Sequence, residues 1–289
     1  MSDTAPATVG APAADAPRPE PRARSRGALR LGLARAAIEL KMFFRERDQL
    51  VFVFSFPVVM LVILASIFSV QYHGTQVTVS QVYVTGLIGA GIMAVSFQNL
   101  GITIAVERDE GALRRLTGTP MPGGAYFIGK ILSVLVIAAV EVAVLLVAGV
   151  LFYDVELPAS PGPWLTFAWV FTLGLAASAL LGIAASSVPR SARGATALIT
   201  MPFVVLQFIS GVFIPFTDLP EWLLRLSAVF PLKWLCQGMR SVFLGDKGAV
   251  LEVTGGYELG RVALVLAAWV VGGFVLCLLT FRWKSRRDG

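Results

Sequence analysis

The chain has 289 residues, of which 56% are hydrophobic and only 15% are charged, whereas about 25% of residues are charged in a soluble globular chain. This composition excludes an ordinary soluble domain and indicates a protein embedded in lipid. The formal net charge is +6, but the basic residues are distributed between connections as in a membrane protein, so we expect no nucleic-acid partner.

The N-terminal residues 1–26 are rich in alanine and proline and contain several arginines near their end. No apolar run precedes those arginines, so this segment is not a signal peptide. We expect a disordered cytosolic tail, followed by a membrane domain over residues 27–289.

Residues 27–48 predict an amphipathic helix that lies in the membrane interface. Apolar residues recur at helical spacing and form one stripe: Leu29, Leu33, Ala36, Ala37, Leu40, Phe43 and Phe44. Basic residues fall away from this stripe: Arg30, Arg35, Lys41 and Arg45. We expect Arg35, Lys41, Phe43 and Phe44 to be the main interface residues. Leu31, Ile38 and Met42 fall on the polar side, which leaves an apolar patch for a partner protein.

Six later stretches are long enough to cross a bilayer, which requires roughly 20 apolar residues. They lie at about 49–70, 82–106, 127–152, 164–188, 195–216 and 259–281. Five of them carry charge only at their ends, and the third contains Glu141 close to its middle. The fold class expected is therefore an all-α integral membrane protein with six transmembrane helices.

Lysine and arginine are concentrated in alternate connections. Of the 24 Lys and Arg residues, 19 fall in residues 1–48, 107–130, 189–194 and 282–289. The connections 71–81 and 153–163 hold none. Because cytosolic connections are enriched in Lys and Arg, this count predicts that both termini are cytosolic, in a multi-pass protein of the cell membrane.

Residues 218–245 predict two short helices on the outer side. The apolar run from Trp222 to Phe230 would span only about 14 Å as a helix, which is too short to cross a bilayer. Pro231 breaks it, and a second short amphipathic run follows. Asp218 is expected to cap the first helix, with Pro220 in its first turn. This pattern indicates a re-entrant hairpin between spans five and six, and an amphipathic loop lying on the surface is the alternative.

The connection between the second and third spans, residues 107–120, has the sequence ERDEGALRRLTGTP. Acidic residues come at its start and arginines at its end, which matches the dipole of a short helix. Leu113 and Leu116 are spaced to present an apolar ridge in the cytosol. Such a helix is suited to docking in a groove of a soluble protein. The pattern is equally typical of an ordinary positive-inside loop, and the residues alone leave both interpretations open.

The segment Gly124–Lys130 fits the first part of a phosphate-binding P-loop. That motif requires Ser or Thr after the lysine and a strand before it, whereas Ile131 follows here and the run enters a spanning helix. We interpret Lys130 instead as an anchor whose stem reaches from the third span to the cytosolic interface. This chain therefore has no predicted ATP-binding loop, and any ATP hydrolysis would have to come from a different chain.

The run 107–120, followed by YFIGKIL at 126–132, resembles the cytosolic loop of ABC-2 type transport permeases, which include the daunorubicin-resistance type of drug and antibiotic exporters. A second stretch is similar to the block that these permeases carry between their fifth and sixth spans: Ser210–Pro215, Asp218–Trp222, Phe230–Leu232, Met239 and Arg240. The resemblance extends from about residue 27 to the C-terminus. It is specific to the family and not to a substrate.

The resemblance implies a division of labour between subunits. Two permease subunits, identical or different, would pair in the membrane above two ATP-binding cassette subunits that use ATP and Mg²⁺. This chain would then bind no cofactor or metal and be no enzyme, and would export a hydrophobic or amphipathic drug, antibiotic or lipid-like substrate. Residues 27–48 would contact the cassette, and the hairpin at 218–245 would form an outer lid. The coupling helix would dock through Glu107, Arg108, Glu110, Gly111, Leu113, Arg114 and Leu116.

Glu141 is expected near the middle of the bilayer. A charged carboxylate there costs at least about 2–3 kcal/mol unless it is paired or faces a wet cavity. One hypothesis is that it contacts a substrate or cation in a translocation path shared with Gln98, Asn99 and Gln207. The alternative, which the residues alone favour, is a neutral acid hydrogen-bonded to another helix through one of these three amides.

An ion-coupled secondary transporter or channel that works without an ATPase is the alternative function. Such a protein would usually show several intramembrane ionisable groups or internal repeats, and the sequence shows one intramembrane acid. A membrane-embedded enzyme acting on lipid would need clustered His, Asp, Ser or Cys residues, and His73, Cys236 and Cys277 are scattered. The leading hypothesis is the permease subunit of an ATP-driven exporter.

Overall fold

The computed structural model of the protein describes residues 21–68, 71, 75, 77–119, 121–189, 191–214, 216 and 219–281. Residues 1–20 of the predicted tail lie outside this part, and so do His73, Pro120 and Asp218. The described residues form helices and short connections, with one isolated bridge between Gln71 and Thr78. The prediction of an all-α fold is confirmed.

Six helical segments in the described part of the chain are long and apolar enough to cross a membrane. Each coincides with a predicted span, with ends that differ by at most seven residues, the largest difference being at the end of the fifth span. Five of them are single helices: α2 (Arg47–Ile67), α6 (Gly123–Tyr153), α7 (Pro161–Ala185), α8 (Ala192–Ile209) and α12 (Leu259–Thr280). The second span consists of three consecutive pieces: α3 (Val79–Met93), the π-helical segment η1 (Ala94–Asn99) and α4 (Leu100–Asp109).

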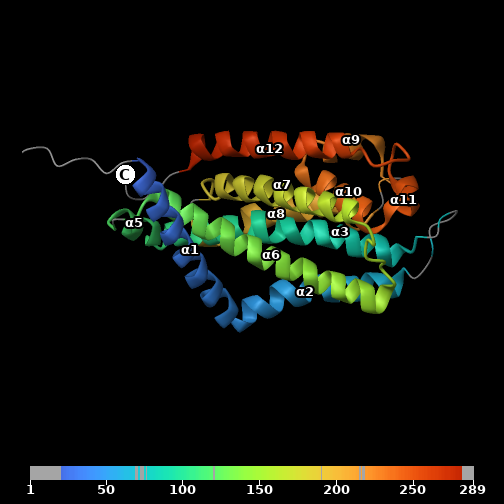
Figure 1. The fold of residues 1–289 in the computed structure, drawn as a ribbon, viewed down its shortest axis with the longest axis horizontal. Coiled ribbons are helices and arrows are strands. Elements are labelled where there is room, and N and C mark those ends of the chain that lie inside the picture. Colours follow the sequence, from blue (N-terminus) through green and yellow to red (C-terminus); the bar gives the residue numbers. More distant parts are fainter. Residues whose placement is uncertain are drawn as a thin grey trace, which may run out of the picture.

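The second span is the centre of the bundle, since 72% of its most apolar window is buried, against 17% for both α2 and α12. Figure 1 shows α12 along one face of the bundle and α2 along the opposite face, with α3, α6, α7 and α8 between them. Helix α12 packs mainly on α7, and α3 packs on α6 and α2. The exposed sides of α2 and α12 are apolar, as expected of helices that face lipid or another membrane subunit.

The π-helical turn η1 interrupts the second span where α7 approaches it most closely. A Cβ atom on Gly182 of α7 would lie 2.6 Å from the backbone oxygen of Phe97. Only glycine permits this approach, because any side chain would meet backbone atoms that cannot move aside. Single π-helical turns inside longer helices are frequent at functional sites.

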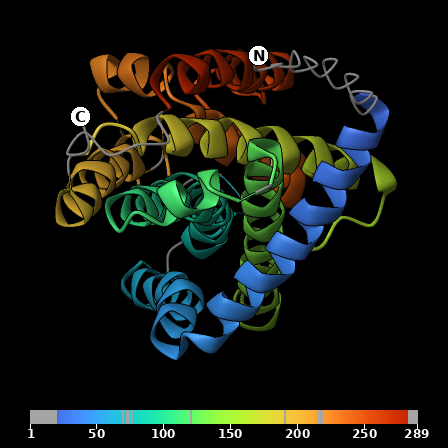
Figure 2. The same cartoon turned by 90° about the vertical axis from the view of Figure 1, so that its left-hand side faces the viewer.

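Helix α1 (Pro21–Arg45) runs obliquely across the end of the bundle that also carries α5 (Ala112–Thr117) and the C-terminal end of α12 (Figures 1 and 2). Its described part already includes residues before the start predicted at 27. Its main contact is with α6, where Gly32 of α1 lies against Ile128 and Gly129 of α6 lies against Arg35. Two glycines therefore allow α1 to pack closely on α6 instead of lying apart from the bundle.

The opposite end of the bundle holds α9 (Glu221–Ser227), α10 (Pro231–Phe243), α11 (Gly245–Gly248) and the 3-10 turn η3 (Ala249–Leu251). Pro220 directly precedes α9 and Pro231 is the first residue of α10, so two prolines set the start of these short helices. Trp222 on α9 is exposed, whereas almost all of α10 is buried against α3, α7 and α12. The alternative of an amphipathic loop lying on the surface does not fit α10.

Candidate functional site

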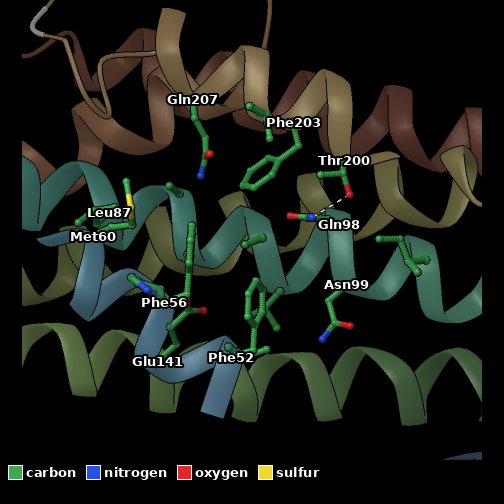
Figure 3. A pocket seen from close by; sticks show the side chains of 18 of the residues that line it. Phe52, Phe56, Met60, Leu87, Gln98, Asn99, Glu141, Thr200, Phe203 and Gln207 are labelled. Atoms are coloured by element: carbon green, nitrogen blue, oxygen red, sulfur yellow. Dashed lines mark hydrogen bonds between the residues drawn. The ribbon is translucent and has the colours of Figure 1, made fainter. Parts of the chain in front are cut away.

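A cavity of about 370 Å³ lies between α2, the second span, α6 and α8. Figure 3 shows its walls, with Phe52, Phe56 and Met60 on one side and Phe203 on the other. Most of the surface is apolar, and the polar side chains come from a few positions. The polar lining residues are Gln49, Gln98, Asn99, Glu141, Thr200 and Gln207.

The four residues predicted for a translocation path all line this one cavity. Gln98 and Asn99 come from η1, Glu141 from α6 and Gln207 from α8. Three separate helical segments thus bring these residues to one cavity, although they are far apart in the sequence. The structure supports their grouping, and their role in transport stays a prediction.

Glu141 is only 2% exposed, and its Oε2 atom has no hydrogen-bond partner among the described residues. Gly91 of α3 leaves the space that the carboxylate occupies, since a Cβ atom there would lie 2.6 Å from Oε1 of Glu141. An ionised carboxylate buried without a partner is strongly unfavourable. The side chain therefore requires a proton, water or a cationic ligand from outside the described chain.

The hydrogen bond from Glu141 to a nearby amide, which is the alternative interpretation, is not present among the bonds of the described residues. Gln98 Nε2 donates to Thr200 Oγ1 at 3.0 Å, and Gln49 Nε2 donates to Asn99 Oδ1 at 3.4 Å. Two of the three amides proposed as partners are thus engaged with other residues. Gln207 lines the cavity, and no bond from it to Glu141 is found within the described part of the structure.

A second cavity, also of about 370 Å³, adjoins the first on the side of α1. It shares Gln49, Asn99 and Ile102 with the apolar cavity, so these three residues form a common wall. In contrast to the first cavity, its lining is rich in charge. The charged lining residues are Arg35, Glu39, Glu46, Glu107 and Lys130.

The charges of the second cavity form a network that joins α1, α4 and α6. Lys130 Nζ on α6 lies 2.6 Å from Glu107 of α4 and 3.0 Å from Glu39 of α1. Arg35 pairs with Glu39 at 2.8 Å, and Tyr126 Oη donates to Glu107 at 2.7 Å. Lys130 therefore connects α6 to both α4 and α1, and the end of α4 is tied to these two helices.

Two interpretations from the sequence are wrong here. Lys130 is 3% exposed, because it pairs with Glu39 and Glu107 within the protein instead of extending along its surface. Arg35 faces α6 and not the headgroups, since it packs on Gly129 and pairs with Glu39. In both cases the partner includes Glu39, which was not among the predicted site residues.

Segment 107–120 does not form a single short helix. The second span continues through Glu107 and Arg108 to Asp109, and the chain then turns at Gly111, whose φ of +73° favours glycine. Only Ala112–Thr117 form the separate helix α5. The acidic residues therefore end one helix instead of starting the next, so the predicted dipole match holds only for the arginines of α5.

The end of α4 is fixed to the connection between α7 and α8. Arg108 is buried, and its Nη2 donates to the backbone oxygens of Ser186 and Pro189. Asp109 accepts a hydrogen bond from the backbone nitrogen of Ala192, at the start of α8, at 2.9 Å. Arg108 is thus a structural link and not part of an exposed docking surface.

The prediction that Leu113 and Leu116 form an exposed apolar ridge in segment 107–120 is wrong. Leu113 has no exposed surface, and Leu116 is half-buried against the core. The exposed predicted residues are Glu110 and Arg114, with Gly111 half-buried between them in the sequence. Any docking surface on this turn is therefore formed by its charged residues, while the leucines attach α5 to the bundle.

The interface residues predicted on α1 separate in the same way. Phe43 is 6% exposed and packs in the core, whereas Phe44 and Lys41 are exposed. The apolar Leu31, Ile38 and Met42 are also exposed. Helix α1 thus has one face on α6 and a mixed apolar and basic face turned outward.

A buried ion pair at the opposite end of the bundle was not predicted. Arg240 of α10 lies 2.7 Å from Glu252, and their side chains are 3% and 2% exposed. Arg240 also donates to the backbone oxygen of Gly211 at 3.0 Å and lies over the ring of Phe216. This arrangement fixes α10 to the segments before α9 and after η3.

The chain is similar to one family of known proteins. The family model described as "ABC-2 type transporter" matches residues 34–244. The chain is also similar to two curated proteins, both called "Probable multidrug ABC transporter permease YbhR", from Escherichia coli strain K12 and from Escherichia coli O157:H7. Each is 25% identical over 156 residues, which are 54% of this chain and 40% of the relative. The match thus spans less than half the length of these relatives.

Proposed function

The chain belongs to the ABC-2 type transporter family, and from this we propose that it is the membrane-spanning permease subunit of an exporter driven by a separate ATPase. Six apolar helices and the family match make it a multi-pass membrane protein. The relatives named as permeases of multidrug ABC transporters support a hydrophobic or amphipathic substrate for this chain. The ATP and Mg²⁺ would be bound by the partner.

The observation that carries the proposal is the pair of adjoining cavities. One is apolar with a single buried carboxylate, and the other is lined by charge, with α1, the end of α4 and the start of α6 among its walls. A permease requires a site inside the bundle and a route to it from one side. The wall formed by Gln49, Asn99 and Ile102 would separate the site from that route.

We place the end with α1 and α5 in the cytosol. Most lysines and arginines occur in the connections of this end, as the positive-inside rule requires. The described ends of α1 and α12 lie at this same end (Figure 1), which agrees with an even number of crossings. The short helices α9 and α10 would then lie on the outer side as a re-entrant lid.

The turn between α4 and α5 would be the place where the ATPase acts. Glu110 and Arg114 are exposed there, while Glu107 and Arg108 of the same segment bond to α6 and to the α7–α8 connection. A displacement of the exposed side would therefore pass directly into helices that line both cavities. Outward-facing residues of α1 would contact the same ATPase.

Two prolines supply points at which the cavity walls can bend. Pro57 lies inside α2 and lines the apolar cavity, and Pro202 lies inside α8 between the lining residues Thr200 and Phe203. A proline inside a helix removes one backbone hydrogen bond and weakens the helix locally. Bending at these positions would switch the cavity between inward and outward access.

A second permease subunit is part of the proposal. The exposed faces of α2 and α8 carry large apolar side chains, among them Phe52, Val59, Met201 and Val205. Both helices also form walls of the apolar cavity. Pairing of two permeases through these faces would enclose the cavity between them, with lipid covering the outer face of α12.

The proposal is tested by charge reversal on the exposed turn. The variants Glu110→Arg and Arg114→Glu should insert and fold normally but lose copurification of the cassette ATPase and substrate-stimulated ATP hydrolysis. Arg225→Glu serves as a matched control, because Arg225 is exposed at the other end of the bundle. Unchanged hydrolysis and export in both turn variants would contradict the proposal, and export without any ATPase would favour an ion-coupled transporter.

A further inference from the structure

We propose that the apolar cavity binds a lipophilic monovalent cation, with the carboxylate of Glu141 as its counter-charge. This inference rests on the proposed export function in one respect, since it names the class of substrate. It concerns the ligand chemistry of the site and can be tested without the ATPase.

The buried carboxylate is the first observation. Glu141 is 2% exposed and lines the cavity, and its Oε2 accepts no hydrogen bond from the described residues. Gly91 gives the carboxylate its space, because a Cβ atom at that position would lie 2.6 Å from Oε1 and 3.2 Å from Oε2. The protein thus makes room for an acid that it does not neutralise.

The second observation is the charge balance of the walls. Glu141 is the one ionisable side chain among the described residues that line this cavity. The basic residues Lys130 and Arg35 line the other cavity and are paired with Glu39 and Glu107. A positive charge that pairs with Glu141 must therefore arrive with the ligand.

The third observation selects the kind of cation. Four phenylalanines line the cavity: Phe52, Phe56, Phe203 and Phe213. Aromatic faces attract cations that have lost their water, such as quaternary or delocalised organic cations. A small metal ion would instead require several oxygen ligands, and no group of three or more His, Cys, Asp or Glu residues suited to a metal is found in the described chain.

The amides of the cavity agree with this selection. Gln98 and Asn99 are bonded to Thr200 and Gln49, so their polar groups are partly occupied within the protein. What remains for a ligand is a single negative charge and the Gln207 amide among apolar walls. Such a site distinguishes ligands by the sign of their charge more than by a set of hydrogen bonds.

A pair of probes of matched shape and opposite charge tests the inference. Binding of radiolabelled tetraphenylphosphonium and of tetraphenylborate is measured on the purified full chain in lipid nanodiscs, and the signal of empty nanodiscs is subtracted. We expect the cation to bind at least about tenfold more tightly than the anion. Equal affinity for the two probes, or preference for the anion, would overturn the inference without any mutation.

Substitution of the carboxylate provides the second arm. Glu141→Gln keeps the shape of the side chain and should reduce cation affinity about tenfold or more, while Glu141→Asp keeps the charge and should retain part of it. Glu156→Gln is the control, since Glu156 is an exposed acid outside the cavity. Cation binding to Glu141→Gln equal to that of the unmodified chain would overturn the inference.

The outcome also separates this inference from the proposed function. If neutral amphiphiles stimulate the partner ATPase while tetraphenylphosphonium does not bind, the export function stands and the cation site is refuted. If the cation binds through Glu141 but no ATPase couples to the chain, the cation site stands and the export function is refuted.

Discussion

Gln49 of α2 donates a hydrogen bond from Nε2 to Oδ1 of Asn99 in the π-helical turn, over 3.4 Å. Both residues line both cavities. The bond therefore crosses the boundary between the charged entrance and the apolar site, and it joins the first span to the second at the point where the second span departs from α-helical geometry. We regard this pair as a latch on the route between the two cavities.

Removal of the latch should open the route while sparing the fold. A single hydrogen bond contributes about 1 kcal/mol, so Gln49→Ala should raise the labelling rate of a cysteine introduced at Ala94 about fivefold. Ala94 lines the apolar cavity, and a membrane-impermeant maleimide applied from the side of α5 reports access to it. Ser66→Ala is the control, because Ser66 is an exposed residue of α2 bonded only within its own helix. The same labelling rate in Gln49→Ala and the unmodified chain would refute the latch.

Gly91→Ala should impair ligand binding with little loss of stability. The new Cβ atom would meet the end of the flexible Glu141 side chain, which can rotate away at low cost but then leaves its place in the cavity. Alanine also favours a helix over glycine by about 1 kcal/mol. Thermal unfolding and tetraphenylphosphonium binding are the two measurements. Gly272→Ala adds an atom with nothing within 4 Å inside α12, so it should show the same gain in helix preference and leave binding unchanged. Normal binding by Gly91→Ala would count against the position assigned to the carboxylate.

Lys130→Met should destabilise the chain because it leaves Glu39 and Glu107 without their shared buried partner. Loss of one member of a buried ion pair costs about 3–5 kcal/mol. The unfolding free energy in detergent is the readout. Lys247→Met is the matched control, since Lys247 pairs with Glu156 on the surface, where both side chains are more than half exposed and the loss should stay below about 1 kcal/mol. Equal stability of the two variants would show that the network contributes no more than a surface pair.

Glu252→Gln should have a comparable effect at the other end of the bundle. Arg240 would keep its bond to Gly211 but lose its only carboxylate among the described ion pairs, so the cost should be about 3 kcal/mol. Limited proteolysis of the segment between α8 and α10 checks whether the lid loosens. Glu221→Gln removes an exposed pair with Arg225 and should leave cleavage unchanged. Protection of the lid in Glu252→Gln would indicate that apolar packing alone holds α10.

The spans were predictable because a helix that crosses the bilayer needs roughly 20 consecutive apolar residues, and such a run is visible in the sequence alone. Both ends of α12 and the positions of Pro220 and Pro231 follow from local rules of the same kind. Glu141 could be selected for a similar reason, since a carboxylate in an apolar run is rare. The grouping of Gln98, Asn99 and Gln207 with it was proposed from polarity alone, and it required the fold to place them together.

The remaining features depend on contacts between distant residues. Leu113 looked like an exposed ridge because nothing in its neighbourhood shows that α5 folds back on the bundle. Glu39 and Glu252 were not among the predicted site residues, since their buried partners Lys130 and Arg240 come from distant parts of the fold. A basic residue predicted inside a packed membrane domain is a signal that could have prompted a search for such acids. The π-helical turn has no known local signature in this sequence.

The central claim is that work done by a separate ATPase enters this bundle through the turn between α4 and α5. The most direct measurement is substrate movement in sealed proteoliposomes that contain the chain with its copurifying cassette ATPase, with and without ATP, using the compound that most stimulates hydrolysis. We expect movement that requires both proteins and ATP and that Glu110→Arg abolishes while Arg225→Glu does not. Movement of the compound by the chain alone, or full activity in Glu110→Arg, would contradict it.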